Sequence, residues 1–158
     1  MQGIKLLFTG KTDSRALASL IAEYQKRLSR FVRIEIEELP DIKNRKTLSE
    51  EEQKNEEGQA LLAAIAPQDI VVLLDEKGKM PTSIELSKWV EQKQIQVPRK
   101  LVFIVGGPYG FSPEVYKAAH EKLSLSKLTF SHQMVRLFLV EQLYRAYTII
   151  HNHPYHHE

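Results

Sequence analysis

One segment of this chain combines residue types that could hold a ligand through the backbone. Gly106-Gly107-Pro108-Tyr109-Gly110 follows an apolar run directly and places three glycines within five residues. Glycine lets a ligand approach the main chain closely and tolerates positive φ angles. The spacing differs from the G-x-G-x-x-G dinucleotide pattern, and no Lys-Ser or Lys-Thr pair follows to form a phosphate loop. The segment predicts either a tight strand-to-helix turn or a site for a nucleotide-like ligand with apolar walls.

A second segment is C-terminal and cationic. Arg136 and Arg145 interrupt a long apolar stretch, and four of the six histidines fall in the last eight residues. Arginine suits bidentate phosphate contacts and stacking on bases, although surface arginines also pair with nearby glutamates. No cysteine or carboxylate at ligand spacing accompanies the histidines, so we expect no physiological metal site.

Two further candidates lie at the ends of predicted strands. Asp75 follows an apolar run and could orient a ribose, or it could begin a solvated loop. Ser126–Ser131 mixes small hydroxyl side chains with Leu128 and Phe130. That mixture suits an adenine slot and equally suits an ordinary strand end.

Length and composition predict one domain over residues 1–158 and a cytosolic location. The 158 residues are 42% hydrophobic and 27% charged, which disfavours disorder and fibrous repeats. No apolar run approaches the ~20 residues of a membrane span, and no signal peptide is recognisable. The absence of cysteine excludes disulfides and thiolate catalysis. A net charge of +2 gives no strong basic field that would draw the protein onto nucleic acid.

The apolar periodicity alternates strands and helices from end to end. Capping signals at Asp13 or Ser14, at Ser49 with Glu52, and at Thr82 predict helix starts, and segments 41–47 and 75–81 are expected to be loops. We therefore expect a single α/β domain with a mostly parallel sheet of about five strands flanked by helices. The predicted strands cover 4–9, 32–37, 69–74, 101–105 and 123–128, and the last two helices cover 113–120 and 132–151.

Ligands of such sheets bind beyond the carboxyl ends of the strands. The exits at 74–76, 106–110 and 127–132 are therefore the expected site. The final helix is apolar on more than one face, so it must be buried on more than one side. We therefore infer that it packs on its own sheet and on a second subunit in a two-fold dimer. The alternative is a helix sandwiched within one subunit.

Several motifs in chain order resemble the ribosomal RNA large subunit methyltransferase H family of the SPOUT superfamily. The resemblance spans the whole chain, and its C-terminal third is the most specific part. The motifs are Gly106-Gly107-Pro108-x-Gly110, Leu125-Ser126-x-Leu128-Thr129, His132-x-x-Val135-Arg136, Glu141-Gln142-Leu143-Tyr144-Arg145-Ala146 and Asn152-His153-Pro154-Tyr155-His156.

The resemblance implies a homodimeric S-adenosylmethionine-dependent enzyme whose C-terminal region forms a trefoil knot around the cofactor site. The implied reaction methylates N3 of a pseudouridine in 23S rRNA on assembled 70S ribosomes, in the cytoplasm, with no membrane or DNA partner. Alternatives are a non-catalytic ribosome-associated factor with this fold, and a SPOUT enzyme that acts on another RNA.

The resemblance also implies roles for individual residues. His132, Arg136, Tyr155 and His156 form the expected catalytic set, and Arg145 is expected at the RNA with the tail of one subunit reaching the other subunit's site. His132, His153 and His156 are the candidate acceptors for the N3 proton. The residues expected to bind or shape the cofactor site are Leu74, Gly106, Gly107, Pro108, Gly110, Leu125, Ser126, Lys127, Leu128, Thr129 and Phe130.

Two positions depart from the family pattern. The family commonly has glutamate where this chain has Tyr109, and arginine or lysine where it has His157. A carboxylate role in the glycine loop is therefore not expected here. A neutral His157 would bind phosphate more weakly than a permanent cation.

Overall fold

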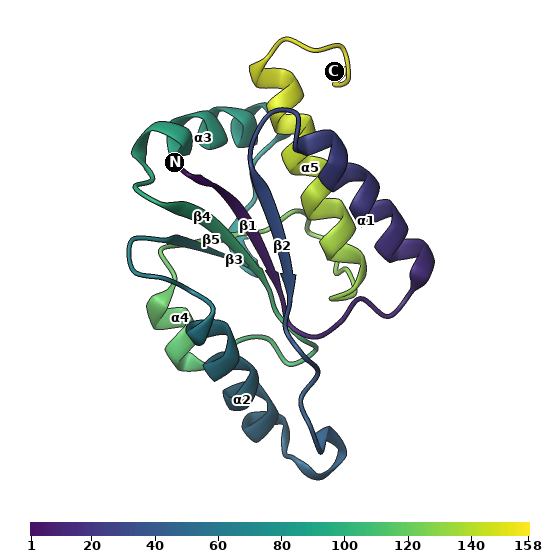
Figure 1. Ribbon diagram of the computed structural model, residues 1–158, viewed down its shortest axis with the longest axis vertical. Helices are drawn as coiled ribbons and strands as arrows, with labels where there is room; N and C mark the ends of the chain where they lie inside the picture. Colours follow the sequence, from purple (N-terminus) through teal and green to yellow (C-terminus); the bar gives the residue numbers. More distant parts are fainter.

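A parallel β-sheet lies at the centre of the computed structural model, which describes residues 1–158 (Figure 1). The order across the sheet is β2-β1-β4-β3-β5, and every pairing is parallel. Parallel neighbours need crossover connections, which explains the regular alternation of strands and helices. The strands are β1 (Gly3–Phe8), β2 (Ile34–Glu38), β3 (Ile70–Lys79), β4 (Lys100–Val105) and β5 (Glu121–Leu123). The helices are α1 (Arg15–Leu28), α2 (Glu50–Ala63), α3 (Ser83–Gln96), α4 (Pro113–Ala118) and α5 (Met134–Ile150), with a 3-10 turn, η1, at Arg45–Thr47.

The two faces of the sheet carry separate apolar clusters. Side chains alternate between faces along each strand. Leu6 and Phe103 therefore pack in the larger cluster with α1, α3 and α5, whereas Leu7 and Ile104 pack in the smaller cluster with α2 and α4. Figure 1 shows α1 and α5 on one side of the sheet and α2 and α4 on the other. Burial on both faces explains why the central strands carry long apolar runs, such as Ile70–Leu74 of β3 and Leu101–Val105 of β4.

The predicted helix starts are confirmed by their caps. The Ser14 hydroxyl accepts a hydrogen bond from the Leu17 N–H at the start of α1. Complete capping boxes begin α2 at Ser49 and α3 at Thr82. Each cap satisfies backbone donors that the first helical turn leaves unpaired.

The apolar surface of α5 is largely buried within the subunit. Both α1 and α3 pack along this helix, and its Leu139, Val140 and Leu143 belong to the larger cluster. The sandwiched arrangement thus accounts for most of the apolar sequence of α5. Met134 and Phe138 remain 41% and 36% exposed.

The chain after Leu74 differs from the prediction. The expected loop 75–81 instead continues β3 to Lys79, which pairs with Leu123 after an irregularity in register. A Cβ on Gly78 would lie 2.6 Å from the Leu123 nitrogen, so glycine permits this close approach of two backbones. The polar run from Asp75 lacks the apolar pattern of a buried strand, and the extension was therefore missed.

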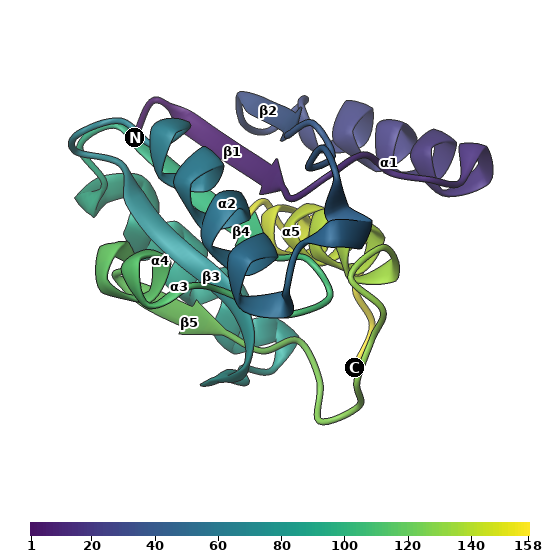
Figure 2. The ribbon, with the colours of Figure 1, turned by 90° about the horizontal axis from the view of Figure 1, so that it is seen from below.

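The last strand is also shorter than predicted. It covers Glu121–Leu123, whereas an extended piece was expected over 123–128. Beyond Leu123 the Ser124 hydroxyl donates to the Ser126 carbonyl, and the Leu128 N–H donates to the Ser126 hydroxyl. These local bonds compete with strand pairing and turn the chain. Figure 2 shows the connection from β5 to α5 as a long loop at the lower edge of the molecule.

None of the helices combines the length and the apolar character that crossing a membrane would require.

Candidate functional site

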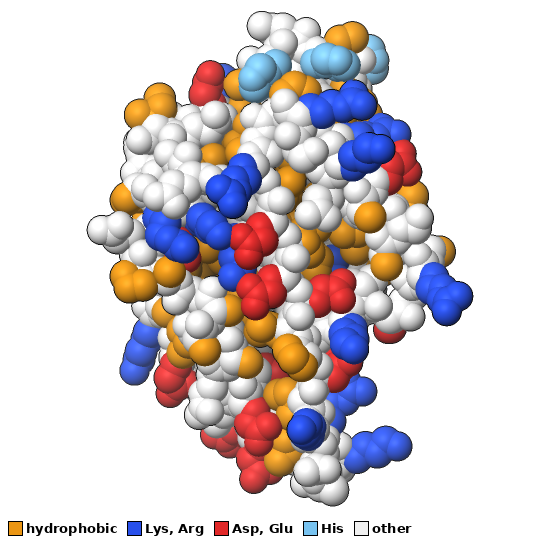
Figure 3. All heavy atoms as spheres, viewed as in Figure 1, with side chains coloured by type: hydrophobic (Ala, Val, Ile, Leu, Met, Phe, Trp, Pro, Cys, Tyr) orange, Lys and Arg blue, Asp and Glu red, His pale blue; other side chains and the backbone are white.

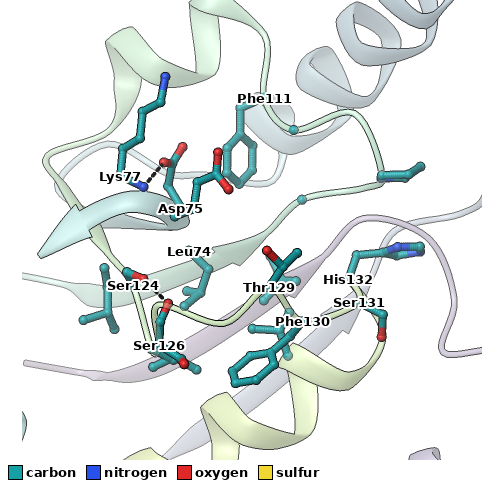
Figure 4. A pocket seen from close by; sticks show the side chains of 18 of the residues that line it. Leu74, Asp75, Lys77, Phe111, Ser124, Ser126, Thr129, Phe130, Ser131 and His132 are labelled. Atoms are coloured by element: carbon teal, nitrogen blue, oxygen red, sulfur yellow. Dashed lines mark hydrogen bonds between the residues drawn. The ribbon is translucent and has the colours of Figure 1, made fainter. Parts of the chain in front are cut away.

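Three segments that leave the sheet enclose one cavity of about 670 Å³ (Figure 4). They are the end of β3 from Leu74, the glycine loop after β4, and the segment 123–132 between β5 and α5. Parallel strands end at the same edge, so residues far apart in sequence meet there. The volume lies in the range typical of small-ligand sites.

Every residue that the resemblance places at the cofactor lines this cavity, and so does His132. Cofactor binding by them stays a prediction, but their convergence in space is a property of the structure. The set comprises Leu74, Gly106, Gly107, Pro108, Gly110, Leu125, Ser126, Lys127, Leu128, Thr129 and Phe130.

Two glycines of the loop, Gly106 and Gly107, pack closely against neighbouring side chains. A Cβ on Gly107 would lie 2.9 Å from Oε2 of Glu57, and a Cβ on Gly106 would lie 2.9 Å from the ring of Phe111. Gly110 has φ +78° and closes the turn by donating its N–H to the Gly107 carbonyl. At its three glycines the loop therefore offers main chain to the cavity.

Asp75 is held in place at the end of the cavity nearest β3. Its Oδ1 accepts a hydrogen bond from the Lys77 N–H at 2.8 Å, and its Oδ2 accepts one from the Tyr116 hydroxyl at 2.5 Å. Burial and the bond to Asp75 raise the pKa of Tyr116 to about 12, so the phenol remains a donor at neutral pH. The result is an oriented carboxylate that could accept ribose hydroxyls or face a positive charge.

The opposite wall has an apolar and a basic part. Phe130 packs against Phe138 of α5 with ring centroids 4.7 Å apart. Next to it, His132 lies at the N-terminal end of α5 (Figure 4). Burial and the charge of Arg136 lower the pKa of His132, so its imidazole is neutral at pH 7 and able to accept a proton.

Arg136 is fully buried, and each of its three side-chain nitrogens donates a hydrogen bond. Its guanidinium donates to the carbonyl oxygens of Thr9 and Gly10, to the Thr12 hydroxyl, and through Nε to the His132 carbonyl. It also lies 4.9 Å over the ring of Phe8. In this arrangement the side chain joins the start of α5 to the end of β1 and positions the cavity wall.

The C-terminal tail forms a separate polar cluster along α5. The Tyr155 hydroxyl donates to Oε1 of Glu141 at 2.9 Å, and Nη2 of Arg145 donates to the same oxygen at 2.7 Å. His156 lies 3.3 Å from Nη1 of Arg145. Burial and hydrogen bonds with Tyr24 and Glu141 raise the pKa of Tyr155, so its phenol is protonated at neutral pH.

The tail lies away from the cavity of its own subunit. Neither Tyr155, His156 nor Arg145 lines the cavity. Figure 1 shows the tail beyond the C-terminal end of α5. The cavity is lined instead by His132 and Val135, at the N-terminal end of this helix. In Figure 3 the histidines gather over the tail, while acidic side chains gather at the opposite end of the molecule over α2.

Two acidic residues at these sites receive no role from the sequence alone. Glu141 holds the tail cluster together, and its spacing of four from Arg145 was the available signal. Glu57 lies 7% exposed behind the glycine loop, with Oε2 unpartnered. Nothing in the periodicity of the α2 sequence distinguishes it from its solvated acidic neighbours.

Comparison with known proteins identifies relatives over almost the whole chain. Residues 1–156 match a family described as predicted SPOUT methyltransferase. A ribosomal RNA large subunit methyltransferase H from Parabacteroides distasonis is 57% identical over 155 residues, which cover 98% of this chain and 99% of the relative. Proteins of the same name from Phocaeicola vulgatus and Bacteroides fragilis are 53% and 50% identical over 153 residues, covering 97% of this chain and 98% of each relative.

Solved structures share the fold at low sequence identity. A probable methyltransferase from Bordetella pertussis superposes with a TM-score of 0.59 at 12% identity, covering 92% of this chain and 96% of that chain. A probable methylase family protein from Haemophilus influenzae gives a TM-score of 0.54 at 12% identity, covering 94% of this chain and 66% of that chain.

Replacement of Arg136 by leucine should destabilise the protein strongly. Leucine fills part of the volume but leaves buried carbonyl groups without donors, at a cost of about 3 kcal/mol. Thermal unfolding should show a Tm lower by roughly 6–12 °C. The control is Arg30→Leu, because Arg30 is exposed and makes no side-chain hydrogen bond or ion pair in the structure. Equal Tm values for the two variants would contradict the positioning role.

Proposed function

Since this chain belongs to the SPOUT methyltransferase family, within it to the ribosomal RNA large subunit methyltransferase H proteins, we propose that it transfers a methyl group from S-adenosylmethionine to 23S rRNA. The observation that carries the proposal is the convergence of the glycine loop, Leu74 and the segment 125–130 on one cavity. Those segments are distant in sequence, and the fold brings them to one edge of the sheet.

The residues of the cavity fit S-adenosylmethionine chemically. Leu125, Leu128 and Phe130 supply apolar walls for an adenine ring, and the glycine loop supplies backbone groups. The oriented Asp75 carboxylate suits ribose hydroxyls, and its negative charge is compatible with a cationic ligand. Bound there, the cofactor supplies an activated sulfonium methyl group, so the protein mainly has to align the acceptor and exclude water.

We propose N3 of a pseudouridine as the acceptor, and this nitrogen carries a proton that must leave. His132 is the group on the cavity wall best suited to receive it. Its imidazole is neutral at pH 7 because burial and Arg136 lower its pKa. The Arg136 Nε–H bonds the His132 carbonyl at 3.2 Å and fixes the backbone of this residue relative to β1. A fixed base near the reacting nitrogen is the arrangement that general-base catalysis needs.

The proposed substrate is the assembled 70S ribosome. The net charge of +2 provides little long-range attraction for free RNA. Specificity would then come from the shape of a particle that presents the nucleotide in a defined position.

We also propose that the protein acts as a homodimer with a trefoil-knotted C-terminal region. Tyr155 and His156 lie away from the cavity of their own subunit, so they would serve catalysis by reaching the cavity of the second subunit. Exposed apolar side chains on α1 and α5, Leu20, Met134 and Phe138, offer surface for such an interface.

Transfer of labelled methyl groups to ribosomes tests the function. With 70S ribosomes from cells that lack this protein, we expect label in 23S rRNA at N3 of a pseudouridine. Separated subunits and free rRNA should accept little or no label. Binding of S-adenosylmethionine without transfer to ribosomes would indicate another RNA substrate. The absence of both S-adenosylmethionine binding and methyl transfer would favour a non-catalytic ribosome-associated factor.

Mixed dimers test whether the tail acts on the second subunit. One subunit carries Gly107→Val, which adds a branched side chain to the loop that lines the cavity, next to the Glu57 carboxylate. The other carries Tyr155→Ala and His156→Ala. Each homodimer should be inactive on ribosomes, whereas the purified mixed dimer should recover about half of the wild-type rate, because one of its two sites is complete. An inactive mixed dimer would show that the tail serves its own subunit.

A further inference from the structure

A second, basic groove runs along the outer edge of the sheet. Its volume is about 710 Å³, and it lies between the extension of β3, the strand β5 and the helices α3 and α4. Its lining holds four lysines, one histidine and a single acidic residue. This is a stronger excess of positive charge than the whole chain has, with its net +2.

The acidic residue of the groove is already paired. Glu121 accepts hydrogen bonds from the Lys93 ammonium and from Nε1 of Trp89. Although burial favours its neutral form, these donors lower the pKa of Glu121 and keep it ionised. Lys93 and Glu121 therefore neutralise each other at the floor of the groove.

The remaining lysines are free to bind a ligand. Lys77, Lys79 and Lys122 are exposed and take part in no ion pair. The Lys122 ammonium lies 5.7 Å over the ring of Tyr116, which is itself 41% exposed. Three unpaired ammonium groups beside an accessible aromatic ring suit a chain of phosphates with intervening bases.

The groove is continuous with the cavity of the functional site. Lys77 and Tyr116 line both of them. Figure 4 shows the Lys77 side chain extending away from Leu74 and the rest of the cavity. A polymer whose reacting unit occupies the cavity could therefore extend past Tyr116 into the groove without a break in the surface.

We propose that Lys77, Lys79 and Lys122 bind the phosphate backbone of RNA next to the nucleotide in the cavity. The inference rests on the proposed function and extends it, since it assigns the sheet edge to the RNA partner. An acidic protein segment is the competing occupant. RNA is favoured because the free charges are lysines near an exposed ring and because the groove adjoins the cavity at Lys77 and Tyr116.

Ribosome binding at several salt concentrations tests the proposal. The variant Lys77→Gln/Lys79→Gln/Lys122→Gln is compared with Lys26→Gln/Lys54→Gln/Lys88→Gln, which removes the same charge from residues outside the groove. Each protein is sedimented with 70S ribosomes from cells that lack it, at roughly 50 to 200 mM KCl. Calorimetry with S-adenosylmethionine checks that the cavity is intact in both variants.

We expect the groove variant to bind ribosomes about tenfold more weakly than wild type, and the control variant to bind nearly as wild type does. The slope of log affinity against log salt should become shallower by roughly 2, since each lost phosphate contact removes about 0.7 to 0.9. Equal losses in the two variants, or an absence of ribosome binding by wild type, would overturn the proposal. So would weaker binding with an unchanged slope, which would indicate a protein partner.

Methyl transfer measured on the same samples separates this proposal from the proposed function. Sedimentation that depends on the groove, without any transfer by wild type, would refute the reaction and retain the RNA-binding groove. If wild type transfers methyl groups and the groove variant sediments with ribosomes as wild type does, the reaction would be retained and the RNA-binding groove refuted.

Discussion

One buried cation connects the parts of the site. The guanidinium of Arg136 donates to the carbonyl groups of Thr9 and Gly10 at the end of β1 and to that of His132 before α5. A buried charge is stable only when its donors are satisfied, so this contact fixes the start of α5 relative to the central strands. The segment 124–132 has almost no regular structure of its own and crosses the cavity between β5 and α5. Its geometry depends on both ends being held, and Arg136 holds one of them.

The cavity and the C-terminal tail are two halves of the proposed site that one subunit keeps apart. The cavity lies at the N-terminal end of α5, whereas Tyr155 and His156 bond with Glu141 and Arg145 farther along the helix. A two-fold partner could supply the missing half, which gives dimerisation a catalytic purpose. The basic groove would then add affinity along the RNA without altering the chemistry, because its free lysines contact phosphates and not the reacting base.

The sequence predicts the central strands and the cavity well, for a physical reason. Buried parallel strands are apolar throughout, so 69–74 and 101–105 are recognisable, and their exits must meet at one edge. The extension of β3 to Lys79 was missed because it depends on Gly78 approaching Leu123 across the sheet, a contact that periodicity does not encode. The burial of Arg136 was missed for the same reason. From sequence alone, an arginine in an apolar helix suggests a surface contact. Its actual acceptors are the carbonyl groups of Gly10 and Thr9, which lie more than a hundred residues earlier in the chain. The tail cluster around Glu141 likewise needs the chain to fold back on α5.

The central claim is that the three strand exits together hold S-adenosylmethionine. Amide hydrogen exchange with and without saturating S-adenosylmethionine tests it most directly, because it reports on every segment of the chain at once. Binding should slow exchange at 74–76, at 106–110 and at 124–131, and should leave α2 and the groove residues Lys79 and Lys122, which do not line the cavity, unchanged. Protection confined to other segments, or none at any of the three exits under saturating conditions, would contradict the assignment of the cavity.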